Sequence, residues 1–96
     1  MHVILWSFRA RPGLESRFEI AYGAGGAWAR LFAAAPGFLG SELMRGSDGR
    51  YLTIDRWESK EAFEAFREAH AAAYAELDAR CEALTAEERS LGTVEA

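Results

Sequence analysis

The sequence predicts an α+β fold in which two helices cover one face of an antiparallel, four-stranded sheet. Strand-like and helix-like hydrophobic patterns follow one another in the order strand, helix, strand, strand, helix, strand. An Asp-Gly pair joins the second and third strand-like segments, as is typical of a hairpin. The length of 96 residues fits one domain over residues 1–96 and leaves no room for a second core.

The first strand is predicted over His2 to Ala10, which is rich in Val, Ile, Trp and Phe and stops at the turn residues Arg11-Pro12-Gly13. A helix follows from Leu14 to about Ala35, where apolar side chains recur every three or four residues. The segment Gly23-Ala24-Gly25-Gly26 interrupts that spacing. Because glycine weakens a helix interior, we expect a kink or a break there.

The hairpin strands are predicted over Phe38–Arg45 and Tyr51–Trp57. Ser59 is a good N-cap for the second helix, whose pattern runs without Gly or Pro to about Leu84. We therefore expect one uninterrupted helix over that stretch. A short last strand is predicted over Glu88–Glu95.

Composition and charge exclude several classes of protein. Eleven basic and fifteen acidic residues give a net charge of −4, the wrong sign for binding nucleic acid. No apolar run approaches the roughly 18 residues that a membrane span requires. The single cysteine, Cys81, cannot form an internal disulfide. An isolated thiol of this kind fits a reducing compartment, so the expected location is cytoplasmic.

The first strand carries apolar side chains on both of its faces. His2, Ile4, Trp6 and Phe8 point to one side, while Val3 and Leu5 point to the other. Two helices cover only one face of a sheet. The simplest cover for the other face is a second copy of the chain, which predicts a homodimer.

The second helix carries an inward stripe with a histidine at its centre. The stripe predicts that His70, Phe66 and Tyr74 face a cavity bordered also by Trp6 and Trp57. A buried imidazole that only serves structure is the more common situation, and this alternative stays open. In the functional alternative, His70 moves a proton or donates a hydrogen bond to a ligand. The stripe consists of Phe63, Phe66, His70, Tyr74, Leu77, Cys81 and Leu84.

Most of the other aromatic side chains are expected in the core, with Trp6 and Trp57 as the best candidates for the wall of a cleft. The glycine-rich segment at residues 23–26 follows a helix and lacks a nucleotide-binding spacing. His2, His70 and Cys81 have no partners at metal-ligand spacing. The acidic residues Asp55 and Glu58 are expected in solvent near the end of the hairpin. The sequence therefore predicts no metal and no cofactor.

Three linked segments read Pro-Gly-Phe-Leu-Gly from Pro36, Trp-Glu-Ser from Trp57 and Glu-Ala-Phe-Glu-Ala-Phe from Glu61. Together they resemble the antibiotic biosynthesis monooxygenase family of the dimeric α+β barrel superfamily. The resemblance implies a ferredoxin-like βαββαβ protomer, a homodimer and a pocket between sheet and helices. Family members include cofactor-independent oxygenases of anthrones and quinols, and enzymes that degrade haem.

The resemblance favours the oxygenase branch. Trp57 matches the tryptophan that ends the third strand in the family, whereas Thr53 departs from the pattern of the anthrone oxygenases, which have an asparagine at that position. The haem-degrading branch has an asparagine on the first strand and a tryptophan on the second helix, where this chain has Trp6 and Phe66. The expected function is cofactor-independent oxygenation of a small phenolic, quinol or anthrone-type molecule. The alternative is a dimeric protein that binds a flat hydrophobic ligand without catalysis.

The expected site follows from these assignments. His70 is the candidate base and Tyr74 the candidate hydrogen-bond donor. The side chains expected to contact the substrate are Trp6, Thr53, Trp57, Phe63 and Phe66.

Overall fold

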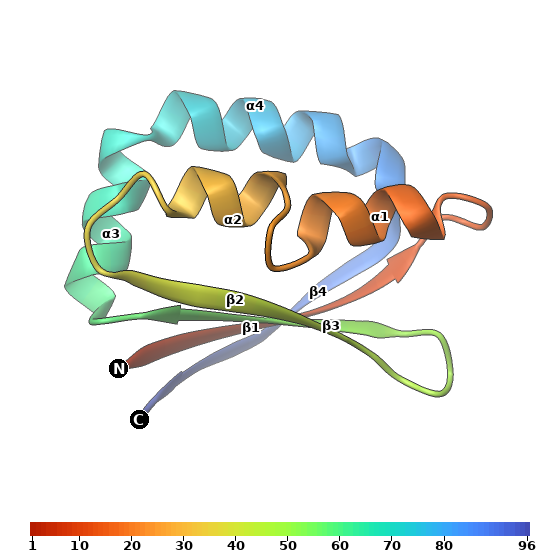
Figure 1. Cartoon of the computed structure of the whole chain (residues 1–96), viewed down its shortest axis with the longest axis horizontal. Helices are drawn as coiled ribbons and strands as arrows, with labels where there is room; N and C mark the ends of the chain where they lie inside the picture. Colours follow the sequence, from red (N-terminus) through yellow and green to blue (C-terminus); the bar gives the residue numbers. More distant parts are fainter.

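A computed structural model describes residues 1–96 and confirms the α+β class, with a four-stranded antiparallel sheet on one side and the helices on the other (Figure 1). The strand order is β2-β3-β1-β4. The strands are β1 (His2–Ala10), β2 (Phe38–Arg45), β3 (Tyr51–Trp57) and β4 (Thr85–Glu95). The first three have the predicted bounds, whereas β4 begins three residues earlier than the sequence pattern indicates.

The first predicted helix is interrupted at its glycines, as expected. Helix α1 (Glu15–Tyr22) ends at Gly23, and α2 (Ala27–Phe32) begins after Gly26. A β-carbon on Gly26 would lie 2.3 Å from the carbonyl oxygen of Ile20, so the chain passes here too closely for any side chain. This close passage lets α1 and α2 follow one another along the same side of the sheet (Figure 1).

The expectation of one continuous helix from Ser59 to Leu84 is wrong. Helix α3 (Lys60–Ala69) ends at His70, where φ is −118° and ψ is 27°, and α4 (Ala71–Cys81) then runs in a different direction (Figure 1). A short 3₁₀ turn, η1 (Glu82–Leu84), follows. The break lets α3 place Phe66 against the end of β3 while α4 places Leu77 over Phe8 and Tyr51. A single straight helix would not reach both the end of β3 and the region of Phe8 and Tyr51.

The core has two parts, which meet along the inner face of the sheet. One part surrounds Phe8, Phe18 and Tyr51, and the other surrounds Trp57 and Phe66. Trp57 is completely buried, with the rings of Phe32, Phe38, Phe63 and Phe66 between 5.2 and 5.7 Å from its own. Burying this many aromatic rings supplies much of the stability of a small domain.

Strand β2 contains an irregularity that changes which side chains face inward. Phe38 pairs with Trp57 and Gly40 pairs with Arg56, so Leu39 is an extra residue in the ladder. Such a bulge shifts the alternation of side chains by one position. Phe38 and Ser41, three residues apart, therefore both face the helices. Gly40 adopts φ +133°, a conformation that side chains disfavour.

The other face of the sheet carries no helix (Figure 1). Cross-strand partners share a face, so Leu5 and its partner Ile54 lie on this side. Met44 and Val94 belong to the same face and are 47% and 51% exposed. None of the helices is long and apolar enough to cross a membrane.

Candidate active site

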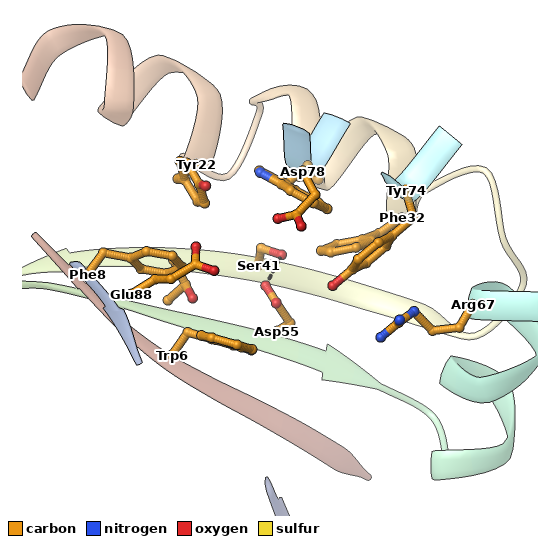
Figure 2. A pocket seen from close by; sticks show the side chains of 13 residues that line it. Trp6, Phe8, Tyr22, Phe32, Ser41, Asp55, Arg67, Tyr74, Asp78 and Glu88 are labelled. Atoms are coloured by element: carbon orange, nitrogen blue, oxygen red, sulfur yellow. Dashed lines mark hydrogen bonds between the residues drawn. The ribbon is translucent and has the colours of Figure 1, made fainter. Parts of the chain in front are cut away.

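A pocket of about 310 Å³ lies between the inner face of the sheet and the helices (Figure 2). This volume is at the lower end of the range that small-molecule sites occupy. Aromatic side chains from both layers form most of its wall. They are Trp6, Phe8, Tyr22, Trp28, Phe32 and Tyr74.

Strand β3 supplies the polar floor of the pocket. Tyr51, Thr53, Asp55 and Trp57 alternate along the strand and point toward the helices. Thr53 and Asp55 line the pocket, and Trp6 on the neighbouring strand is the cross-strand partner of Thr53. The floor therefore combines one large aromatic surface with a hydroxyl and a carboxyl group.

Asp55 is the innermost acidic side chain of the pocket. The hydroxyl of Ser41 donates a hydrogen bond of 2.7 Å to Oδ1 of Asp55 (Figure 2). Burial raises the pKa of the Asp55 carboxyl above its usual value, and the Ser41 hydrogen bond opposes that rise. A carboxyl with a raised pKa beside an apolar cavity is suited to accepting a proton from a ligand.

The mouth of the pocket is charged. Asp78 from α4, Glu88 from β4 and Arg67 from α3 line it, and all three are exposed. Desolvation raises the pKa of Glu88, and the neighbouring Asp78 carboxylate raises it further. The Arg67 guanidinium lies over the Tyr74 ring, 4.2 Å from its centroid. Arg67 is the single cationic residue of the lining, against three acidic ones.

Tyr74 lies where α4 approaches the sheet, and its hydroxyl lies on the pocket side of the ring (Figure 2). Burial raises the pKa of this phenol, while the Arg67 charge acts in the opposite direction. The phenol is therefore protonated near neutral pH and available as a hydrogen-bond donor.

The residues singled out from the sequence are divided among three places. Trp6, Thr53 and Tyr74 line the pocket described above. Phe66 and His70 line a second cavity of about 320 Å³, whose other lining residues are mostly alanines. Trp57 and Phe63 pack in the aromatic cluster and line neither cavity.

The expectation that His70 shares a cavity with Trp6 and Trp57 is therefore wrong. The His70 ring stacks on Phe66, with 5.3 Å between the ring centroids. The helix break directs it toward the alanine-lined cavity beside Ala35 and Ala69. Trp57, predicted as an accessible wall, is fully buried instead.

The sequence patterns do not identify Asp55 and Ser41 as partners. The expectation that Asp55 lies in solvent is wrong, although the alternation of Thr53, Asp55 and Trp57 indicates a shared inner face. That signal is present in the sequence. The inward position of Ser41 depends on the bulge at Leu39, for which the sequence offers only the glycine at position 40.

No group of three His, Cys, Asp or Glu side chains is arranged to hold a metal ion. The polar groups of the pocket suit an organic ligand, since they combine three carboxyl groups, hydroxyl groups and a guanidinium within aromatic walls.

Comparison with known proteins identifies the family. The model of the family described as antibiotic biosynthesis monooxygenase matches residues 1–77. The chain belongs to the antibiotic biosynthesis monooxygenase family. The matched stretch contains Trp6, Ser41, Asp55, Arg67 and Tyr74, whereas Asp78 and Glu88 at the mouth lie beyond it.

Solved structures of the antibiotic biosynthesis monooxygenase fold resemble the whole chain. SnoaB, a cofactor-independent oxygenase from Streptomyces nogalater, is 22% identical with a TM-score of 0.71, covering 99% of this chain and 91% of SnoaB. The ActVA-Orf6 monooxygenase of Streptomyces coelicolor, in complex with nanaomycin D, is 20% identical with a TM-score of 0.74, covering 99% and 86%. At these identities the likeness establishes the ferredoxin-like fold alone.

Two further relatives are described with haem or with a manganese porphyrin. A mycobilin-producing heme oxygenase of Mycobacterium tuberculosis is 41% identical over an alignment of 59 positions that covers 59% of this chain. The match spans half the length of that curated relative. A MhuD variant with two manganese protoporphyrin IX molecules per active site is 29% identical with a TM-score of 0.68, covering 100% of this chain and 94% of MhuD.

Proposed function

We propose that the protein is a cofactor-independent monooxygenase that oxidises a small anthrone-type, quinol or phenolic substrate in the pocket above Asp55. Family membership supports a monooxygenase-like role. The observation that carries the proposal is the Asp55 carboxyl, held at the base of an aromatic pocket with one oxygen fixed by Ser41. This arrangement provides a proton acceptor beside surfaces that bind a flat ring.

The chemistry needs only a substrate that gives electrons to O₂ once it has lost a proton. For an anthrone, Asp55 accepts a proton from the ring methylene, and the resulting carbanion reduces O₂ and bonds to one oxygen atom. That oxygen becomes the new carbonyl, and the other leaves in water with the two methylene hydrogens. The methylene carbon loses four electrons and O₂ gains four, so no external reductant takes part.

The other groups of the pocket assist this step. Trp6 and the aromatic wall hold the ring in one plane, which orients the methylene toward Asp55. Tyr74 donates a hydrogen bond to the oxygen on which negative charge develops. His70 lies outside this pocket, so we propose Asp55 in its place as the base.

The test is oxygen uptake by the metal-free protein with a panel of anthrones and hydroquinones. We expect Asp55→Asn to lower kcat by about 10²- to 10⁴-fold, the range for loss of a general base. His70→Asn retains a residue that tolerates the non-helical backbone at the helix junction, and its uptake should stay near the wild-type rate. If His70→Asn abolishes uptake while Asp55→Asn does not, the base is His70 and our assignment is wrong.

The same panel separates catalysis from simple binding. Wild-type uptake no faster than the uncatalysed background, together with saturable binding of these compounds, would show a carrier of flat hydrophobic molecules instead of an oxygenase. Isothermal titration of the same compounds provides the binding measurement.

Haem fits this pocket less well than a neutral aromatic molecule. Three of the lining residues are acidic and one is cationic, so the pocket repels the two propionates of haem. The lining contains no histidine to bind the iron. We expect no saturable change in the Soret band when haemin is added at micromolar concentration. A saturable change that Asp55→Asn leaves intact and Phe66→Ala removes would place haem in the second cavity.

We also propose a homodimer formed through the uncovered face of the sheet. Leu5, Leu52, Ile54, Met44 and Val94 supply apolar surface on this face, beside the Arg56–Glu42 ion pair, whereas the helix side is already covered. Apolar side chains gathered on an uncovered surface are typical of a contact with another chain. An isologous contact of two such faces would cover it in both copies.

A further inference from the structure

We infer that Ser41 is a positioning residue that fixes the Asp55 carboxylate for proton transfer. The inference rests on the proposed function and deepens it. It assigns a role to a side chain on β2, a strand that contributes no other residue to the lining of the pocket.

The geometry of the pair comes from the strand register. Ser41 and Asp55 are direct cross-strand partners on β2 and β3. The extra residue Leu39 turns Ser41 to the same face as Asp55, and the Ser41 hydroxyl then donates to Oδ1 at 2.7 Å. Without the bulge, Phe38 and Ser41 would point to opposite faces of the sheet.

The bond uses one carboxylate oxygen and leaves the other available. Oδ1 accepts the hydrogen bond from Ser41, while no hydrogen bond from the protein reaches Oδ2. Asp55 also takes part in no ion pair, although Arg56 follows it in the sequence and pairs with Glu42 on the other face. Ser41 is therefore the one protein group that orients this carboxylate.

The bond also tunes the acidity of Asp55. A hydroxyl that donates to the ionised carboxylate favours that form, whereas burial disfavours it. Loss of the hydroxyl therefore leaves burial unopposed. Hydrogen bonds to charged groups have free energies that correspond to a shift of about one to two pH units in the pKa of the carboxyl.

The first measurement does not depend on activity. The pKa of Asp55 is measured in the ligand-free full chain by carbon-13 NMR, with Asp55→Asn used to assign the carboxyl signal. We expect Ser41→Ala to raise this pKa by about one to two pH units. Ser41→Thr retains the hydroxyl, so the pKa of Asp55 in this variant should be close to the wild-type value. Ser47→Ala makes the same chemical change in the exposed hairpin loop and should leave the pKa of Asp55 unchanged.

The second measurement is the pH dependence of kcat/KM. Because the base works in its ionised form, the acidic limb of the Ser41→Ala profile should move to higher pH with the pKa. An unchanged Asp55 pKa in Ser41→Ala would overturn the inference whatever the activity. A raised pKa with an unmoved acidic limb in an active enzyme would overturn the role of Ser41 in the reaction. Absence of turnover in the wild type would refute the proposed function, and the inference about the reaction with it.

Discussion

At the scale of single residues, the main feature is that Asp55 lies where burial disfavours the ionised carboxylate. Burial raises its pKa, so the ionised form is less favourable in the folded chain than in the unfolded one. Replacing it by Asn keeps an oxygen that accepts the Ser41 hydrogen bond and removes the charge. We expect Asp55→Asn to stabilise the protein at pH 7 by roughly 0.5–2 kcal/mol, measured by urea unfolding.

The pH dependence of that difference identifies its cause. A carboxyl whose folded pKa is raised makes the native state lose stability as the pH rises from the unfolded pKa through the folded one. Below the unfolded pKa, Asp55 is protonated in both states, and the difference between wild type and Asp55→Asn should largely disappear. If the difference in free energy of unfolding between the two proteins stays constant from pH 7 down to pH 3, the charge of Asp55 is not its cause.

The candidate site could be predicted in part from single residues. Trp6, Thr53 and Tyr74 were assigned to a pocket and do line one. The sequence does not predict the position of His70, because the alanine-rich helix pattern contains no Gly or Pro that would indicate the break beside it. Asp55 was missed because it lies near the end of a strand, where acidic residues are commonly solvated, although its neighbours on alternate positions are buried.

At the scale of elements, the bulge of β2 depends on Gly40. Its φ of +133° is strained for any residue with a side chain, although a β-carbon there would meet nothing within 4 Å. We expect Gly40→Ala to lower the free energy of unfolding by about 1–3 kcal/mol through backbone strain alone. The measurement is urea unfolding monitored by tryptophan fluorescence.

Gly25→Ala is the matched control, because a β-carbon at Gly25 also meets open space and its φ lies outside the left-handed region. It should be neutral or stabilise by a few tenths of a kcal/mol, since it lowers the entropy of the unfolded chain. Equal effects of the two substitutions would contradict the role of the positive φ at Gly40.

The elements themselves were largely predictable, and the departures have physical causes. Strands β1, β2 and β3 follow local patterns of apolar and turn residues, which the sequence displays directly. The early start of β4 at Thr85 does not show in its polar sequence, because pairing with β1 imposes the extended backbone. The bulge and the helix break depend on contacts between elements, and local sequence patterns do not predict such contacts.

At the scale of the whole molecule, the uncovered sheet face predicts the association of two chains. We expect sedimentation equilibrium to give about twice the chain mass of 10.6 kDa at micromolar concentration. Leu5→Glu introduces a charge at the centre of this face and should give a monomer. Ile20→Glu changes an apolar residue of α1 that is 75% exposed, and should leave the dimer intact. A wild-type monomer, or dissociation by both variants, would contradict the proposed interface.

The position of β1 at the centre of the sheet has a consequence for how the chain is made. Of the four strands, β1 is synthesised first and β4 last, and their partners His2 and Glu95 are 93 positions apart. Until β4 is synthesised, one edge of β1 has no neighbour and is open to pairing with other nascent chains. Glu88 reaches the mouth of the pocket only when β4 docks. A nascent chain that has not yet formed β4 therefore holds an incomplete pocket, which is completed when this eleven-residue strand pairs with β1.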